Sequence, residues 1–191
     1  MHKNNKYKKL NVNEFGEFYL RFSKKIKRMT ISINLIGDLM VVVPIYNTLE
    51  DVFEFIYSKN KWIKENKNKI ITKNIRVINF DFDSDLLNTF KLKIKLKVDQ
   101  ISMENNFNYS KIHFKNMISR WGSCSSKNNI SFNTLMYHLE DDLQDYIIKH
   151  ELLHTKIKNH SKEFWNALEE ICENSKQKNT TINRSYFIKY Y

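Results

Sequence analysis

The sequence contains little glycine and almost no proline, alanine or cysteine. Three glycines, one proline and two cysteines occur in 191 residues, and the one alanine is Ala167. So few glycines and prolines exclude collagen-like repeats and flexible, low-complexity linkers. The two cysteines, Cys124 and Cys172, are too few and too far apart for a disulfide framework or a CxxC pair. We therefore expect free thiols, as in a reducing compartment.

Long apolar runs are also missing. No stretch approaches the roughly 18 apolar residues that a membrane-spanning helix requires, so we expect none. The first ten residues, MHKNNKYKKL, are basic and lack the apolar segment of a secretory signal. We therefore expect a cytoplasmic protein. Hydrophobic residues make up 41% of the chain, which suffices for the core of one domain.

Positive charge is abundant, and the net charge is +11. Such an excess is typical of proteins that bind nucleic acids. However, the lysines are spread along the chain, only five basic residues are arginine, and asparagine is frequent. This pattern favours a general compositional bias over a phosphate-binding patch. DNA association through a basic surface stays an alternative.

The first third of the sequence predicts a polar arm, a β-hairpin and a helix. Residues 1–28 are polar and basic, and we expect an irregular arm there. Residues 29–35 alternate between apolar and polar side chains, as a half-buried strand does. Gly37 and Asp38 predict a two-residue turn into a second strand, LMVVVPI. Thr48, with Asp51 three residues later, predicts a capping box at the start of a helix.

The remainder predicts further strands followed by helices. Residues 84–102 contain an alternating KLKIKLKV stretch, but their length without a turn residue favours a helix. A turn is expected at Asn128, because asparagine tolerates positive φ. Asp141 and Gln144 predict a second capping box. We expect strands at 75–82, 111–115 and 129–133, and helices at 142–154 and from Ser161 onward.

This order of elements, without regular βαβ alternation, indicates an α+β fold. We expect a polar N-terminal arm at residues 1–21, one folded domain at residues 22–175, and a polar C-terminal tail at residues 176–191.

The stretch KHELLHTKIKNH, residues 149–160, contains three of the six histidines. His150 and His154 are four residues apart, so a helix places both imidazoles on one face, where they can share a metal ion. Glu151 lies about 100° around the helix, where it can take a proton from a metal-bound water as a general base. The surrounding residues are apolar, which indicates a buried helix in which these polar groups need partners. The pattern predicts one catalytic zinc ion.

His160 is the expected third zinc ligand. A continuous helix would turn it onto the wrong face, so the chain must break after His154. Asn159 can adopt a left-handed cap, and Ser161 can begin the next helix. In the alternative, a carboxylate of the last helix, from Glu169 or Glu170, replaces His160 as the ligand.

Three segments together resemble the YgjP-like (WLM/SprT-related) metallopeptidase family. They are SRWGSCSSKNNISFN, DYIIKHELLH and NHSKEFW, and the resemblance extends over about residues 22–173. It implies a compact zincin-like domain with an N-terminal β-hairpin, a small sheet and an active-site helix. It also implies a zinc hydrolase with His150, His154 and His160 at the metal positions and Glu151 at the catalytic position. The stretch MYHLED departs from the family's usual Ala-Pro, and Asn128 stands where a glycine is usual.

The WGSC stretch follows a possible substrate-binding residue. Arg120 can hold a substrate carboxylate or phosphate, or stabilise an oxyanion; alternatively it pairs with the acidic run 140–142. Trp121 favours the core over a substrate platform. Cys124 is a possible extra ligand, although packing is the simpler role. We predict no functional role for His113 and His138 and expect both to be surface residues.

The sequence thus predicts a zinc-dependent metallopeptidase that acts on peptides or proteins. We expect no association with a membrane. One alternative is a metal-dependent hydrolase of phosphorylated small molecules such as nucleotides, although no glycine-rich phosphate loop is present. The other is a DNA-associated protease or binding module.

Overall fold

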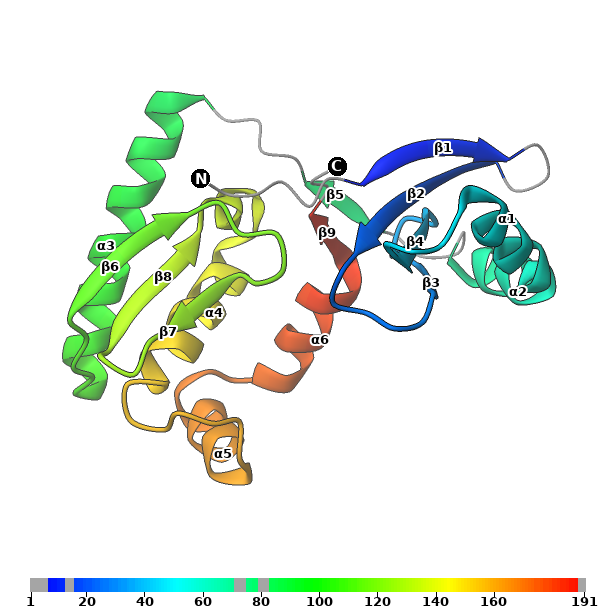
Figure 1. Cartoon of the computed structure of the whole chain (residues 1–191). Helices are drawn as coiled ribbons and strands as arrows, with labels where there is room; N and C mark the ends of the chain where they lie inside the picture. Colours follow the sequence, from blue (N-terminus) through cyan, green and yellow to red (C-terminus); the bar gives the residue numbers. More distant parts are fainter. Residues whose placement is uncertain (1–6, 13–15, 71–74, 79–82, 189–191) are drawn as a thin grey trace. The chain divides into compact units, whose positions relative to one another are not determined.

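The chain divides into two compact units, residues 1–76 (unit 1) and residues 77–190 (unit 2). Helices and strands occur in both units (Figure 1), which confirms the expected α+β class. The boundary at residue 76 was not predicted. The structure is a computed structural model, and it describes residues 7–12, 16–70, 75–78 and 83–188.

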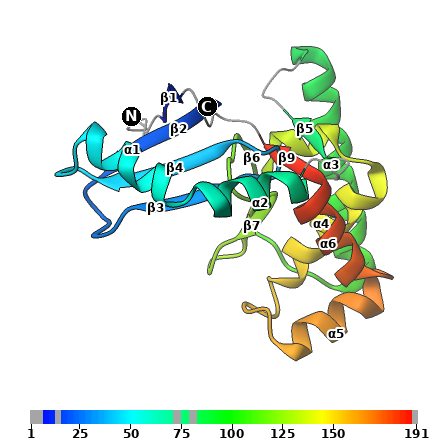
Figure 2. The same ribbon diagram turned by 90° about the vertical axis from the view of Figure 1, so that its right-hand side faces the viewer.

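Unit 1 is a four-stranded sheet with two helices on one face (Figure 2). Strands β2 and β4 are parallel, and the other two pairs are antiparallel. The core between sheet and helices is fully apolar, and it includes Phe18, Leu20, Val41, Val52, Ile56 and Ile63. In the order β1-β2-β4-β3 the strands are β1 (Lys8–Val12), β2 (Gly16–Ser23), β4 (Leu39–Pro44) and β3 (Thr30–Ile33), and the helices are α1 (Leu49–Ser58) and α2 (Asn60–Ile70).

The structure confirms the hairpin and the first capping box but corrects two details of unit 1. The Thr48 hydroxyl accepts a hydrogen bond from the Asp51 backbone N–H, and the Thr48 backbone N–H donates to the Asp51 carboxylate. The hairpin loop spans residues 34–38, not two residues, because the Asn34 side chain accepts bonds from two backbone N–H groups of the loop. The irregular arm expected at residues 1–28 is wrong for the described part, since residues 8–12 and 16–23 form strands. The pairing of residues 16–23 with apolar β4, and of residues 8–12 with residues 16–23, outweighs their polar composition.

Unit 2 is a three-stranded sheet covered by α3 and α4 on one face (Figure 1). Its core contains Ile94 and Val98 from α3, Phe132 from β8, and Ile147 and Ile148 from α4. The sheet order is β6-β8-β7, so β7 lies at an edge, and β5 and β9 pair separately. The elements are β5 (Arg76–Ile78), α3 (Ser84–Asn105), β6 (Lys111–Lys115), β7 (Gly122–Cys124), β8 (Asn129–Asn133), η1 (Thr134–His138), α4 (Asp141–Leu153), α5 (Lys162–Ile171), α6 (Ser175–Ser185) and β9 (Tyr186–Ile188).

Most sequence predictions for unit 2 are confirmed. The ambiguous segment 84–102 is helical, and the strands at 111–115 and 129–133 have the expected bounds. Asn128 has a positive φ of 58° at the predicted turn. The predicted strand 75–82 is present as β5, while its residues 79–82 lie outside the described chain.

Two predictions for unit 2 are wrong. The capping box at Asp141 does not form, because the buried Gln144 side chain donates instead to the carbonyls of Met136 and Leu139 (3.2 and 2.7 Å). The described part of the expected polar tail, 176–188, forms most of α6 and all of β9. Apolar side chains on one face of this segment, Ile182, Tyr186 and Ile188, join the core and hold it in place.

No described helix has both the length and the apolar character needed to cross a lipid bilayer.

Candidate metal centre

Two of the three motif histidines lie at the end of α4. His150 is in the last turn of this helix, and His154 is its C-cap residue with helical φ and ψ. Their spacing therefore places both rings on one side, with ring centroids 4.9 Å apart. Because Ile148, Leu152 and Leu153 are buried, α4 packs on nearly all sides. Glu151, between the two histidines, is only 6% exposed.

The chain bends after His154 and returns with His160. The backbone N–H groups of Thr155, Lys156 and Ile157 bond to the last carbonyls of α4 and end the helix. Ser161 then accepts a hydrogen bond from the backbone of Phe164 and caps α5, as predicted. Asn159 does not adopt the predicted left-handed conformation. Its side chain instead accepts a hydrogen bond from the Ser161 N–H, which tightens the bend.

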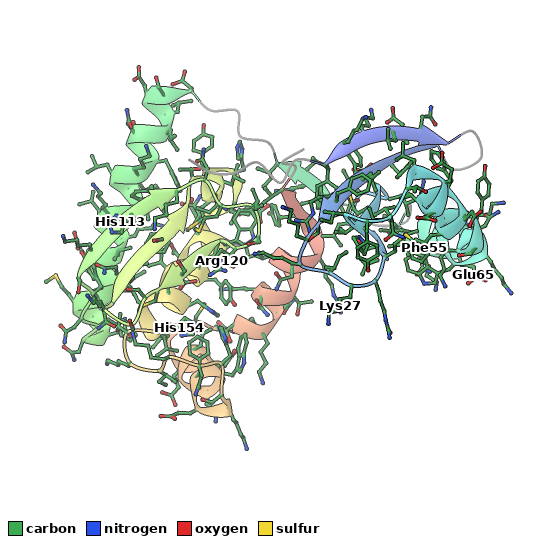
Figure 3. The ribbon with its side chains drawn as sticks, in the orientation of Figure 1. Lys27, Phe55, Glu65, His113, Arg120 and His154 are labelled. Atoms are coloured by element: carbon green, nitrogen blue, oxygen red, sulfur yellow. The ribbon has the colours of Figure 1, made fainter. Side chains whose placement is uncertain are left out.

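The bend brings the three imidazoles together. The Nε2 atom of His160 lies 2.9 Å from Nε2 of His150 and 3.1 Å from Nε2 of His154. Among the described residues, these three histidines form the group that can offer three ligand atoms to one metal ion, all within 4.8 Å of one another. Figure 3 labels His154 near the end of α4, where the chain turns toward α5.

Neighbouring groups orient two of the rings. Nδ1 of His154 lies 2.8 Å from the carbonyl of Ile157. A carbonyl only accepts, so Nδ1 carries the hydrogen and the Nε2 lone pair faces the cluster. The Tyr146 hydroxyl lies 3.3 Å from Nδ1 of His150 and can accept in the same way. Phe164 stacks on His154 with ring centroids 4.5 Å apart. These contacts match the supporting shell that metal-binding histidines usually have.

Burial shifts the pKa values of this group. Burial, together with the charges of the two neighbouring imidazoles, lowers the pKa of His150 to about 3. Burial also lowers the pKa of His154. The pKa of Glu151 rises to about 8 because of burial, although the nearby Arg120 opposes the rise. The rings of His150 and His154 therefore favour the neutral form, which is the form that binds a metal.

The donor set fits zinc. Three neutral imidazoles without a carboxylate ligand are found in catalytic zinc sites that keep one position open. Ligand nitrogens at about 2.0–2.1 Å from a tetrahedral zinc ion lie about 3.3 Å from one another. The two Nε2 distances that involve His160 are a few tenths of an ångström shorter than this. A shift of a few tenths of an ångström in the His160 ring would bring these two pairs to the tetrahedral separation.

The histidines open into a cleft of about 750 Å³ within unit 2. One wall is the loop before β7 together with β7 itself, and another is formed by α6 and β9, which the sequence prediction had treated as a tail. The lining includes Arg120, Trp121, Gly122, Ser123 and Cys124 on the first wall, and Asn179, Ile182, Asn183, Tyr186 and Phe187 on the second.

The remaining predicted residues have mixed outcomes. Arg120 (Figure 3) is exposed and lines the cleft. The acidic run pairs with lysines, Asp141 with Lys93 and Asp142 with Lys178, each at 2.6 Å. The acidic run therefore does not need Arg120 as its partner.

Trp121 both packs against the core and lines the cleft, edge-to-face with Tyr186 at 6.2 Å. Cys124 is half-buried beside the cleft but is not part of the histidine cluster. Glu169 accepts three hydrogen bonds that hold the start of α6, so it is used as a cap. His113 is exposed and His138 is half-buried beside Tyr137.

Sequence reasoning missed several residues of the site. Tyr146 lies four residues before His150, so the helical spacing could have identified it as a partner of that ring. Asn179 and Asn183 have the same spacing on α6, but that segment was not predicted to be helical. Lys158 also lines the cleft. Lys158 lies in the bend after α4, and the sequence does not determine the path of that bend.

Comparisons with known proteins relate this chain to metallopeptidases. The profile of the family described as YgjP-like, metallopeptidase domain, matches residues 81–185, more than half of the chain. It begins well after residue 22, where the expected resemblance started. A solved structure, that of the metallopeptidase zymogen of Methanocaldococcus jannaschii jannalysin, is 31% identical, with a TM-score of 0.42. The match covers 47% of this chain and 92% of that one. No curated protein matches. The chain belongs to the YgjP-like family of metallopeptidase domains.

Proposed function

We propose that this metallopeptidase domain binds one zinc ion through His150, His154 and His160 and uses Glu151 as its general base. The convergence of three Nε2 atoms at the end of α4, next to a buried carboxylate, carries the proposal. Zinc in such a site supplies a Lewis acid that lowers the pKa of a bound water and polarises a carbonyl oxygen.

Glu151 does the proton transfer in this proposal. Its carboxylate accepts the proton of the attacking water and can pass it to the leaving amine nitrogen. Burial at 6% exposure keeps bulk water away from that carboxylate. The same burial raises its pKa to about 8, and the positive charge of a bound zinc ion would lower that pKa toward the carboxylate form that a base needs. Glu151 lies between His150 and His154 in the sequence of α4.

Arg120 is the proposed contact for a negatively charged or carbonyl oxygen of the substrate. It is exposed, it lines the same cleft, and its charge acts on Glu151. A guanidinium binds a carboxylate or phosphate in a bidentate manner. We further propose that the substrates are peptides or proteins of the cytoplasm, where the free thiols Cys124 and Cys172 would stay reduced.

The decisive experiment compares the wild type with Glu151→Gln and His154→Ala. We expect about one zinc per wild-type chain and per Glu151→Gln chain, and clearly less for His154→Ala. In a quenched-fluorescence peptide library, turnover by Glu151→Gln should fall about 10²- to 10⁴-fold. Unchanged turnover would remove Glu151 from the mechanism.

The same screen includes nucleoside triphosphates. Zinc-dependent release of phosphate or pyrophosphate, with no peptide cleavage, would replace the peptidase proposal by hydrolysis of phosphorylated small molecules. The chain has only three glycines in all. Because phosphate-binding loops usually depend on glycine, we expect peptide cleavage.

A further inference from the structure

Gly122 lies against the side chain of Glu151. A Cβ atom built on Gly122 would come within 2.5 Å of Cγ, 2.6 Å of Oε1 and 2.8 Å of Cδ of that glutamate. Ordinary carbon contacts lie at about 3.5–4.0 Å, so none of these three distances is compatible with a methyl group. The close atoms make up most of the glutamate side chain, which could not avoid the methyl by a small rotation of its end.

The backbone of Gly122 does not itself require glycine. Positive φ is found at Gly16 and Gly37 but not at Gly122. An alanine could therefore adopt the same backbone conformation without strain. The reason for a glycine at this position is the space that Glu151 occupies.

The strand that carries Gly122 is held firmly and cannot withdraw from an added methyl. Asn133 is fully buried, and its backbone N–H donates to the Trp121 carbonyl at 2.8 Å. The Asn133 side chain donates to the carbonyls of Met117 (2.6 Å) and Arg120 (2.9 Å). Gly122 itself is opposite Phe132 of β8, which is fully buried. These bonds fix the backbone directly before and beside Gly122.

Helix α4 is equally unable to move. Leu152, next to Glu151, is fully buried, and His150 packs against the Phe164 ring with centroids 4.9 Å apart. A methyl at position 122 must therefore be accommodated by the Glu151 side chain alone, which has to take another rotamer.

We propose that Gly122 is a positioning residue that reserves the place of the Glu151 carboxylate beside the histidine cluster. This assigns a physical role to the glycine of the WGSC stretch. Its consequence for turnover rests on the proposed function of Glu151, whereas its consequence for packing does not. The two can be measured separately by combining Gly122→Ala with substitutions of Glu151.

The first readout is turnover of the best peptide from the library, with zinc-loaded protein. Gly122→Ala alone should lower kcat at least about 100-fold, while KM changes less than about threefold and the zinc content is retained. Added to Glu151→Gln, it should change the residual rate less than about twofold, because the base is already lost. An equal loss in both backgrounds, or a loss of zinc, would mean that Gly122 acts by another route.

The second readout is thermal unfolding, which does not depend on activity. Gly122→Ala should lower the unfolding temperature of the wild type by roughly 3–10 °C through overpacking. In a Glu151→Ala background the close atoms are gone, and the same substitution should be neutral or stabilising, as Gly→Ala is at an unstrained site. Equal destabilisation in both backgrounds would overturn the proposal. If Glu151→Gln keeps full turnover, the proposed mechanism fails. The unfolding temperatures of Gly122→Ala in the wild-type and Glu151→Ala backgrounds still decide the role of Gly122.

Discussion

The two units contain the same number of basic residues but differ in net charge. Residues 1–76 and residues 77–191 each have sixteen lysines and arginines, with seven acidic residues in the first part and fourteen in the second. The net charges are therefore +9 and +2, which together give the +11 of the chain. The lysines are spread along the chain, as the composition suggested, but the excess of positive charge lies mainly in unit 1.

The difference lies in how unit 2 uses its carboxylates. Asp141 and Asp145 pair with lysines of α3, and Asp142 pairs with Lys178 of α6. Acidic side chains also cap helices there, as Asp83 does for α3. Exposed pairs of this kind contribute little stability individually, but they leave the surface of unit 2 nearly neutral overall. The unit that contains the proposed zinc site is thus distinct from the unit that contains the positive charge.

The largest expected effect is that zinc stabilises unit 2 alone. At free zinc near 1,000 times its Kd, binding stabilises the folded state by about 4 kcal/mol. Removing zinc with a chelator should therefore speed hydrogen exchange in residues 147–165 and leave residues 16–23 and 39–44 of unit 1 unchanged. Hydrogen-exchange mass spectrometry measures both at once.

His154→Ala is the matched control for this measurement, because its exchange should not respond to the chelator. An equal response of unit 1 in the wild type would show that the two units are energetically coupled. The prediction that zinc stabilises unit 2 alone would then be wrong.

The second effect concerns the bend that carries His160. The Lys158 ammonium donates to the Asn128 side chain at 2.5 Å and to the Ser125 carbonyl at 3.1 Å. It thereby ties the bend to the turn between β7 and β8. Lys158→Met should make zinc dissociate about 10-fold faster, at the lower end of the loss expected for supporting groups around a metal site. Transfer of zinc to a fluorescent chelator in stopped flow measures this rate.

Lys162→Met, at an exposed position beyond the bend, should leave the rate unchanged. A Lys158→Met protein that releases zinc at the wild-type rate would show that the bend holds its shape without this tie.

Local patterns predicted much of this fold. Thr48 and Ser161 act as caps because a capping hydrogen bond needs only residues three or four positions apart. The spacing of His150 and His154 likewise follows from one helix. The predictions failed where distant contacts decide the structure. Residues 16–23 become a strand by pairing with β4, and the α6 segment is ordered by burying Ile182 and Tyr186.

The candidate site shows the same division. The three histidines and Glu151 could be named from the sequence, because their residue types and spacing carry the chemistry. The role of Gly122 could not, since it depends on β7 lying against α4, which brings together Gly122 and Glu151, 29 positions apart in the sequence. The α6 wall of the cleft was missed for the same reason.

A third, smaller effect locates the charge of unit 1. Lys24, Lys25, Lys27 and Arg28 are exposed between β2 and β3. Replacing all four with glutamine should weaken any binding to duplex DNA and reduce the dependence of log K on log salt by up to about 3.6, or 0.9 per phosphate contact.

The control replaces four exposed lysines of unit 2 (Lys95, Lys111, Lys115 and Lys127) and changes net charge equally. If both variants lose binding alike, overall charge decides and unit 1 has no special role. If the wild type does not bind duplex DNA even at low salt, a role in DNA association is excluded.

The smallest effect is a sensitivity of unit 2 to alkaline pH through Tyr109. Burial and the hydrogen bond from its hydroxyl to Asp99 together raise the pKa of this tyrosine to about 12. The folded state thus favours the neutral phenol, whereas the unfolded chain ionises near pH 10. The stabilisation is complete below pH 10 and is lost as the pH rises from 10 to 12.

Lysines titrate in the same range, so the wild type must be compared with Tyr109→Phe, which keeps every lysine. Between pH 9 and pH 11 the unfolding temperature of the wild type should fall about 1–3 °C more than that of the variant. Parallel curves would mean that Tyr109 ionises equally easily in both states, and that burial in unit 2 does not protect it.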